Sequence, residues 1–427
     1  MNKRKSLVFL NSSASELDWI LPIIEYLLNN SVNIEIIYRT EAANKSVRSN
    51  DSLNRYLESH AQIKYFKLGW IARVINLLGF YLYRIKPMLG NSKIFNYCFN
   101  ILDRILNYIY TGNLSKSVTN DTINDQYLIF SEIPNLKKSL GSQRIWMERS
   151  FKQSIFFYCP HSPMIHHLSG LKSAYPCDNY IIPKSSSYIL LGGPGDLKAY
   201  ENGHYELSRV VPVYIGHPKY SDKWISFFNE TSHVSNFNNS NNVVKILIIS
   251  RGVGCSLTQD QQKSLVSLTI KVIHESFSNY QLIIKKHPRE RESYWDIVAR
   301  QNPSIYFTKE PISKMACTVD FSVAFWSSSV VECCILGMPV IEFFLSTHLL
   351  LGAVTSQQPG DLSKKFGLGL FADNEDDFRL AVDKITNQDC KVSLETIHPS
   401  FQIFLKRANK WEIYFEKILN SNNIFLK

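Results

Sequence analysis

Residues 229–242 read NETSHVSNFNNSNN, and residues 243–250, VVKILIIS, follow directly. The first stretch is rich in asparagine and serine and nearly free of apolar side chains, which is typical of a linker between domains. The second is a continuous apolar run of the length of one strand. One structural unit therefore ends before residue 229 and another starts at residue 243, so the sequence predicts two domains.

Short apolar strands alternate with helical patterns on both sides of this linker. Before it, strands are expected at residues 7–11, 32–38, 63–66, 127–130, 154–158, 188–191 and 210–215. After it, they are expected at 243–250, 281–286, 305–308, 321–325 and 340–344. This alternation predicts parallel sheets covered by helices. The expected division is an α/β domain over 1–228, the linker 229–242, a second α/β domain over 243–400 and a helix over 401–427.

The composition indicates a folded protein with a phosphate-bearing partner. The chain has 427 residues, of which 45% are hydrophobic and 20% charged, which excludes a disordered or collagen-like chain. Its net charge of +10 suits a nucleotide or an anionic membrane surface, and we expect no nucleic acid. The eight cysteines have no repeated spacing, which favours reduced thiols in a cytoplasm, and neither a signal peptide nor a membrane span is visible.

A basic turn follows the expected strand 281–286. It reads Lys285-Lys286-His287-Pro288-Arg289-Glu290. A histidine at a strand end can donate a hydrogen bond to a phosphate oxygen or stabilise a leaving phosphate, and Pro288 fixes the turn. The alternative is a solvated basic turn without a ligand.

Three serines mark the junction between the expected strand 321–325 and the next helix. Ser327, Ser328 and Ser329 are placed to cap that helix and to form a phosphate cradle with its free N–H groups. Glu332 lies one turn into the helix, where a carboxylate can accept hydrogen bonds from both ribose hydroxyls. The alternative is a capping box between Ser329 and Glu332.

A third candidate follows the first strand of the second domain, at Arg251-Gly252-Val253-Gly254. Glycine lets the backbone approach a phosphate, and Arg251 could clamp it. An ordinary turn is the alternative.

His-Pro after one strand, then S-S-x-x-E and Gly337-x-Pro339-Val340, resembles the C-terminal half of GT-B glycosyltransferases of bacterial surface polysaccharide assembly. The nearest resemblances are the CDP-glycerol glycerophosphotransferase-like enzymes and the CMP-Kdo or CMP-sialic acid transferases. Residues 157–163, FYCPHSP, resemble the WHGTP stretch of the glycerophosphotransferases. The resemblance implies a GT-B-like α/β fold, with two Rossmann-type domains facing a cleft and a C-terminal helix packing back towards the first domain.

The resemblance also implies a function: transfer of a sugar from a nucleotide donor, preferably CMP-linked, to a hydroxyl of a growing capsule or lipopolysaccharide type glycan. Ser162 and Phe325-Trp326 depart from the glycerophosphotransferase pattern, so a sugar is the group expected to move. The expected donor site consists of Arg251, Gly252, Lys285, His287, Pro288, Ser327, Ser328, Ser329 and Glu332. Positive groups and helix dipoles stabilise the leaving nucleotide, so neither a metal nor a cofactor is expected. A CDP-glycerol-type glycerophosphotransferase, a UDP-sugar 2-epimerase-like enzyme and a non-catalytic membrane scaffold remain alternatives.

Transfer to a hydroxyl needs a general base within hydrogen-bond reach, in the domain that holds the acceptor. Glu16, Asp18 and His161 are the candidates, beside His287 as the catalytic group of the donor side. The alternative for the two acids is the charge that favours a helix N-terminus, and for His161 it is a buried, hydrogen-bonded ring.

Two acidic or histidine-rich stretches could suggest a metal. Asp373–Asp377 is better interpreted as the acidic start of a helix, and His161, His166 and His167 lack a fourth ligand at suitable spacing. We predict no metal at either place.

Residues 69–111 combine many aromatic residues with interspersed arginine and lysine. Helices of this kind can lie in a bilayer interface. We expect peripheral attachment to the inner face of the cytoplasmic membrane, where a lipid-linked glycan acceptor would be met. A pair of core helices is the alternative.

Overall fold

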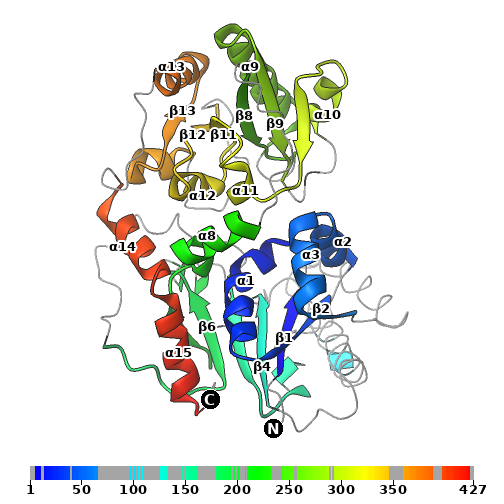
Figure 1. The fold of residues 1–427 in the computed structure, drawn as a ribbon, viewed down its shortest axis with the longest axis vertical. Helices are drawn as coiled ribbons and strands as arrows, with labels where there is room; N and C mark the ends of the chain where they lie inside the picture. The colour runs from blue at the N-terminus through cyan, green and yellow to red at the C-terminus, as the bar shows by residue number, and fades with distance from the viewer. Residues whose placement is uncertain are drawn as a thin grey trace.

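The computed structural model describes residues 5–10, 14–38, 41–65, 97, 101, 104–105, 108, 126–132, 147–148, 150–160, 179–193, 196–197, 200–201, 207, 209–231, 243–253, 257–287, 290, 293–345, 359–387 and 397–423. Two parallel sheets, one in each half of the chain, lie one above the other in Figure 1. The predicted fold class, two Rossmann-like α/β domains, is confirmed.

The first sheet has the order β3-β2-β1-β4-β5-β6-β7, and all its pairs are parallel. Its strands are β1 (Lys5–Leu10), β2 (Asn33–Tyr38), β3 (Gln62–Tyr65), β4 (Tyr127–Glu132), β5 (Ile155–Cys159), β6 (Ser187–Leu191) and β7 (Val211–Tyr214). Its described helices include α1 (Ala14–Asn29), α2 (Glu41–Arg48), α3 (Asp51–His60), the short η2 (Pro218–Tyr220) and α8 (Asp222–Thr231). The strand order reverses between β1 and β4, so the crevice for a ligand is expected at their carboxyl ends.

The second sheet has the order β10-β9-β8-β11-β12-β13, again parallel throughout. Its strands are β8 (Val244–Ile249), β9 (Tyr280–Lys285), β10 (Ile305–Thr308), β11 (Phe321–Ala324), β12 (Val340–Phe343) and β13 (Leu370–Ala372). Its described helices are α9 (Gln259–Ser276), α10 (Tyr294–Ala299), α11 (Ile312–Met315), α12 (Ser329–Ile335), η3 (Asp361–Lys365) and α13 (Glu375–Thr386). Here the order reverses between β8 and β11.

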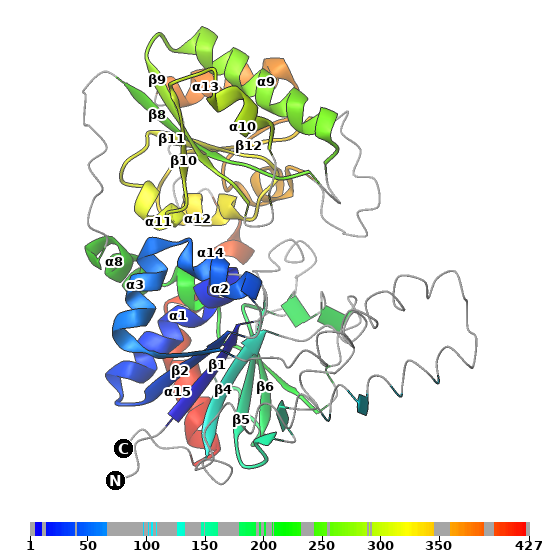
Figure 2. The same cartoon turned by 90° about the vertical axis from the view of Figure 1, so that its right-hand side faces the viewer.

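Both sheets are buried on both faces, which explains why their strands are nearly continuous apolar runs. In β8, Ile246 and Ile248 pack under α9 and α13, whereas Leu247 and Ile249 pack towards α11 and α12. Figure 2 shows these two helical layers on opposite faces of the sheet. This packing fixes the register of β8 and therefore the position of the loop that follows it.

The C-terminal segment differs from the single helix expected over 401–427. It forms α14 (Pro399–Ala408) and α15 (Trp411–Ser421), separated by a turn at residues 409–410. Phe401 and Phe404 join the core of the second domain, whereas Trp411 and Phe415 join that of the first. The chain turns because its two halves pack on different domains, and the predicted return to the first domain is confirmed (Figure 1).

The crossover between the domains is packed closely against α14. Gly216 has φ +82°, and a Cβ there would lie 2.8 Å from the backbone of Arg407 and Ala408, so only glycine allows this approach. Arg407 Nη1 donates a hydrogen bond to the Tyr214 carbonyl at 2.7 Å. α8 then continues to Thr231, three residues into the range predicted as linker, and residues 232–242 lie outside the described part of the chain.

Candidate functional site

The candidate donor site lies at the reversal point of the second sheet. Arg251, Lys285 and Ser327 come at or just after the carboxyl ends of β8, β9 and β11, which are neighbours in the sheet. Ligands of open α/β sheets bind in the crevice at such a reversal point. The structure therefore brings together three stretches that the sequence analysis selected separately.

Arg251 joins the loops after β8 and β11. Its Nη1 donates a hydrogen bond to the Trp326 carbonyl at 2.6 Å, and its guanidinium carbon lies 4.2 Å from the centroid of the Trp326 ring. Trp326 is buried and has φ +46°, a left-handed conformation that strains a non-glycine residue by about 1–3 kcal/mol. Arg251 thus stabilises a strained turn immediately before the three serines.

The basic turn after β9 presents His287 to solvent. The two lysines before it make bonds within their own domain: Lys285 Nζ donates to the Glu310 carbonyl at 2.6 Å, and Lys286 forms an ion pair with Asp296. His287 is exposed, and its backbone N–H donates to Glu290 Oε2 at 3.2 Å. Pro288 lies outside the described residues.

The serines and Glu332 do not form the alternative capping box. Ser329 is the first residue of α12 and not its N-cap; the N-cap is Ser328, whose side chain makes no cap bond. Ser327 Oγ instead accepts a hydrogen bond from the Ser329 N–H at 3.3 Å. Glu332 Oε2 lies 3.7 Å from Lys219 Nζ of the first domain. Glu332 therefore faces the boundary between the domains.

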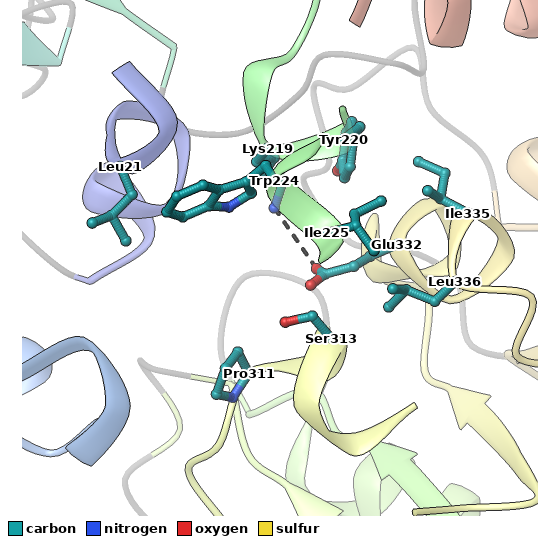
Figure 3. Close-up of a pocket in the computed structure, with 10 residues that line it drawn as sticks. All are labelled: Leu21, Lys219, Tyr220, Trp224, Ile225, Pro311, Ser313, Glu332, Ile335 and Leu336. Atoms are coloured by element: carbon teal, nitrogen blue, oxygen red, sulfur yellow. Dashed lines mark ion pairs between the residues drawn. The ribbon is translucent and has the colours of Figure 1, made fainter. Parts of the chain in front are cut away.

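A small cavity surrounds this ion pair (Figure 3). Leu21, Lys219 and Trp224 line it from the first domain, and Pro311, Ser313 and Glu332 line it from the second. Its volume is about 40 Å³, against about 300–1,000 Å³ for ligand pockets. The domains are thus in contact here, and a ligand on Glu332 would have to displace Lys219.

A buried network surrounds His217, two residues before Lys219 in the chain. Trp19 Nε1 donates to His217 Nδ1 at 2.6 Å, and His217 Nε2 lies 3.4 Å from Asp196 Oδ2. Burial lowers the pKa of His217, so the ring is neutral with Nδ1 as the acceptor. A Cβ at Gly192 would lie 2.1 Å from His217 Cδ2, so this position also requires glycine. The sequence analysis did not select Trp19, Asp196 or His217, the members of this network.

Two of the three candidate bases, Glu16 and Asp18, follow β1 at the reversal point of the first sheet. Glu16 and Asp18 belong to the first turns of α1, after β1, but their side chains and the whole of His161 lie outside the described parts. β4 ends at Glu132, a partly exposed carboxylate beside the reversal point that the sequence analysis did not select. The sequence signal that could have identified Glu132 is an acidic residue at the end of an apolar strand.

No group of three metal-ligating side chains occurs within the described ranges. In the acidic stretch 373–377, Asn374 caps α13, since its Oδ1 accepts from the Asp377 N–H at 2.9 Å. His161, His166 and His167 lie outside these ranges.

Residues 69–111 are described only at Tyr97, Ile101, Arg104, Ile105 and Tyr108. Tyr97 and Tyr108 are 69% and 82% exposed, and both isoleucines are also exposed. Across the parts of the chain that are described, no helix combines the length and the apolar character needed to cross a bilayer.

Comparison with known proteins shows the fold. No family model and no curated protein matches the chain. A solved UDP-N-acetylglucosamine 2-epimerase matches with TM-score 0.52 and 8% identity, covering 100% of this chain and 98% of its own. The Rickettsia bellii UDP-N-acetylglucosamine 2-epimerase gives 0.51 and 10%, covering 99% and 98%.

The Methanocaldococcus jannaschii UDP-GlcNAc 2-epimerase, solved with UDP-GlcNAc and UDP, gives TM-score 0.50 and 12% identity, covering 96% of this chain and 99% of its own. The likenesses to these three structures extend over nearly the whole chain. They show the fold that this chain shares with the three epimerases: two Rossmann-like α/β domains, each built on a parallel sheet.

Proposed function

We propose that this protein is a glycosyltransferase that takes its sugar from a nucleotide donor held by the second domain. The observation that carries this proposal is the convergence of Arg251, His287 and Ser327 at one reversal point, with Glu332 on the following helix. Cationic, hydrogen-bond-donating and hydroxyl groups at such a point suit a diphosphate or monophosphate ester. A carboxylate one helical turn away suits ribose hydroxyls.

In this proposal the donor phosphate lies between His287 and the serines. His287 and the backbone N–H groups stabilise the charge that develops on the leaving nucleotide. Glu332 holds the ribose, and a carboxylate of the first domain, Glu16, Asp18 or Glu132, or else His161, removes the proton from the acceptor hydroxyl. No metal is required for this stabilisation, because protein donors supply it.

The preferred donor is a CMP-linked sugar of the Kdo or sialic acid type, and the preferred acceptor is a capsule or lipopolysaccharide type glycan. The support for both is the resemblance of the His-Pro and Ser-Ser motifs. We also propose peripheral attachment to an anionic membrane surface through residues 69–111, supported by the exposure of Tyr97 and Tyr108.

A UDP-sugar 2-epimerase is the second candidate, favoured by the three epimerase structures that share the fold. An epimerase converts its nucleotide sugar without an acceptor, whereas a transferase needs one. Turnover of the nucleotide sugar measured with and without acceptor glycan therefore separates the two reactions.

The first experiment is a thermal-shift screen of CMP, CDP, UDP and GDP, followed by turnover of the sugar donors of whichever nucleotide binds. His287→Ala should then lower kcat about 10²-fold while the fold is kept, as loss of a donor to a developing anion does. Lys286→Ala is the matched control, because Lys286 directly precedes His287 but pairs with Asp296. No shift with any nucleotide, or equal kcat for His287→Ala and wild type, would refute the proposal.

A further inference from the structure

Glu290 places a buried carboxylate behind the candidate donor site. It is 9% exposed and receives three hydrogen bonds, from the residue after β8, from helix α9 and from the turn after β9. Ser250 Oγ and Gln262 Nε2 each donate to Oε1 at 3.0 Å, and the His287 backbone N–H donates to Oε2 at 3.2 Å. Ser250 follows β8 and His287 follows β9, so this one carboxylate connects both strand ends.

Two of the three donors around Glu290, the Gln262 amide and the His287 backbone N–H, cannot be reversed to suit a neutral amide. Gln262 Nε2 also donates to the Arg251 carbonyl at 2.9 Å, and Gln262 Oε1 accepts from the Tyr294 N–H at 3.0 Å. The orientation of the Gln262 amide is therefore fixed by its other bonds. Because the backbone N–H of His287 is also a donor only, the position of Glu290 needs a group that accepts through both oxygens.

The loop after β8 is packed directly on Glu290. A Cβ on Gly252 would lie 2.9 Å from Glu290 Cβ, so glycine is needed for the loop to reach this position. The packing of Glu290 against Gly252, with its bond to the His287 N–H, thus sets the distance between the Gly252 backbone and the His287 turn.

We propose that Glu290 is a positioning residue that holds the loop after β8 and the turn after β9 together as one cradle for the donor phosphate. The inference rests on the proposed function, because it names the organisation of that same site. The negative charge of Glu290 does not exclude a phosphate from the site. Three hydrogen-bond donors compensate that charge on the buried side of the loops. Without Glu290, His287 and the Gly252 backbone would lose their common support.

The test compares Glu290→Gln with Glu342→Gln. Glu342 is a matched control in the same domain: it is 1% exposed and accepts from Gly360 N, Ser363 N and Ser363 Oγ at 3.0, 3.3 and 2.9 Å. These partners lie at the N-cap of η3 and within η3, away from the loops after β8 and β9. Both variants should lose thermal stability, which alone does not distinguish a positioning role from a structural one.

The deciding readout is nucleotide affinity, titrated with CMP, CDP and UDP in turn. Glu290→Gln should raise Kd about tenfold or more, as loss of hydrogen bonds to a charged group does, while Glu342→Gln leaves Kd unchanged. Ser250→Ala, which removes one donor and keeps the carboxylate, should weaken binding by a smaller factor, and it decides the question if Glu290→Gln does not fold.

Unchanged nucleotide affinity in the Glu290 or Ser250 variant, or an equal loss in Glu342→Gln, would overturn the inference while leaving the proposed function intact. A wild-type protein that binds none of CMP, CDP, UDP and GDP would overturn both. The two failures are therefore distinguishable in one set of titrations.

Discussion

The ion pair between Lys219 and Glu332 joins the two domains at the candidate donor site. Measuring its coupling energy tests whether Glu332 is available to a ligand. Lys219 lies in the crossover of the first domain and Glu332 in α12 of the second, with Nζ and Oε2 3.7 Å apart. Their side chains are only 17% and 23% exposed. The perturbation is a double-mutant cycle of Lys219→Met, Glu332→Gln and the double variant.

The expected coupling energy is intermediate between that of surface and buried pairs. Two unit charges at this distance interact by about 4 kcal/mol at an effective dielectric constant of about 20. Desolvation and the ordering of two long side chains remove most of this gain, and exposed pairs retain about 0–1 kcal/mol. For a pair that is mostly shielded from solvent we expect a coupling of about 1–2 kcal/mol.

The assay is urea unfolding of the four proteins, with and without a nucleotide that binds. If Glu332 turns to the ribose hydroxyls, bound nucleotide should bring the coupling close to zero. The control is the pair Lys223–Glu412, 2.7 Å apart, because Lys223 is 74% exposed and the coupling should be small with or without ligand.

Two results would refute this reasoning. A coupling below about 0.3 kcal/mol in the free protein, which is the ordinary error of additivity, would show that the charges do not interact across the boundary. A full coupling that persists with nucleotide bound would exclude Glu332 as the ribose ligand.

Three further predictions test other parts of the molecule. Arg251→Met should lower the free energy of unfolding by about 1–3 kcal/mol through loss of the charged bond and ring contact to Trp326, and an unchanged urea midpoint would contradict it. The lowered pKa of His217 means that the unfolded chain binds more protons, so wild-type stability should fall as pH drops below about 6.5, by at most about 1.4 kcal/mol per pH unit. His217→Gln keeps the neighbouring Asp196 and Lys219 but should lack this decline in stability. Parallel profiles of unfolding free energy against pH for the two proteins would disprove that His217 causes it. The full chain should sediment with anionic liposomes at low salt and less so at high salt. Recovery in the supernatant at both salt concentrations would favour the alternative, that residues 69–111 are core helices.

The strands were predictable from sequence because burial on both faces makes each an uninterrupted apolar run. The run 243–250 corresponds to β8 at Val244–Ile249, and the alternation with helices gives the parallel topology. The break between α14 and α15 was not predictable in this way. The amphipathic pattern continues through Asn409 and Lys410 without proline or glycine, and the turn arises only because two different domains receive the two halves.

The candidate donor groups were visible in the sequence because histidine, arginine and serine at strand ends carry recognisable chemistry. Their supports were not visible, because they act over long sequence separations. Ser250 bonds to Glu290 across 40 positions, and Arg251 bonds to the carbonyl of Trp326 across 75. The left-handed backbone of Trp326 likewise depends on that distant contact, since tryptophan has no intrinsic preference for such a conformation.

Nucleotide recognition and reaction type are separable on this chain. The phosphate and ribose ligands that we propose all belong to the second domain, where Arg251 and Glu290 fix the loops from behind. A transferase and an epimerase of this fold would both need such a cradle, so nucleotide binding cannot distinguish them. We propose that the distinction comes from the first domain, because proton removal from an acceptor hydroxyl or from the donor sugar requires a base within hydrogen-bond reach. Glu132 is a described carboxylate at that reversal point, and loss of turnover in Glu132→Gln with nucleotide affinity retained would assign the chemistry to the first domain.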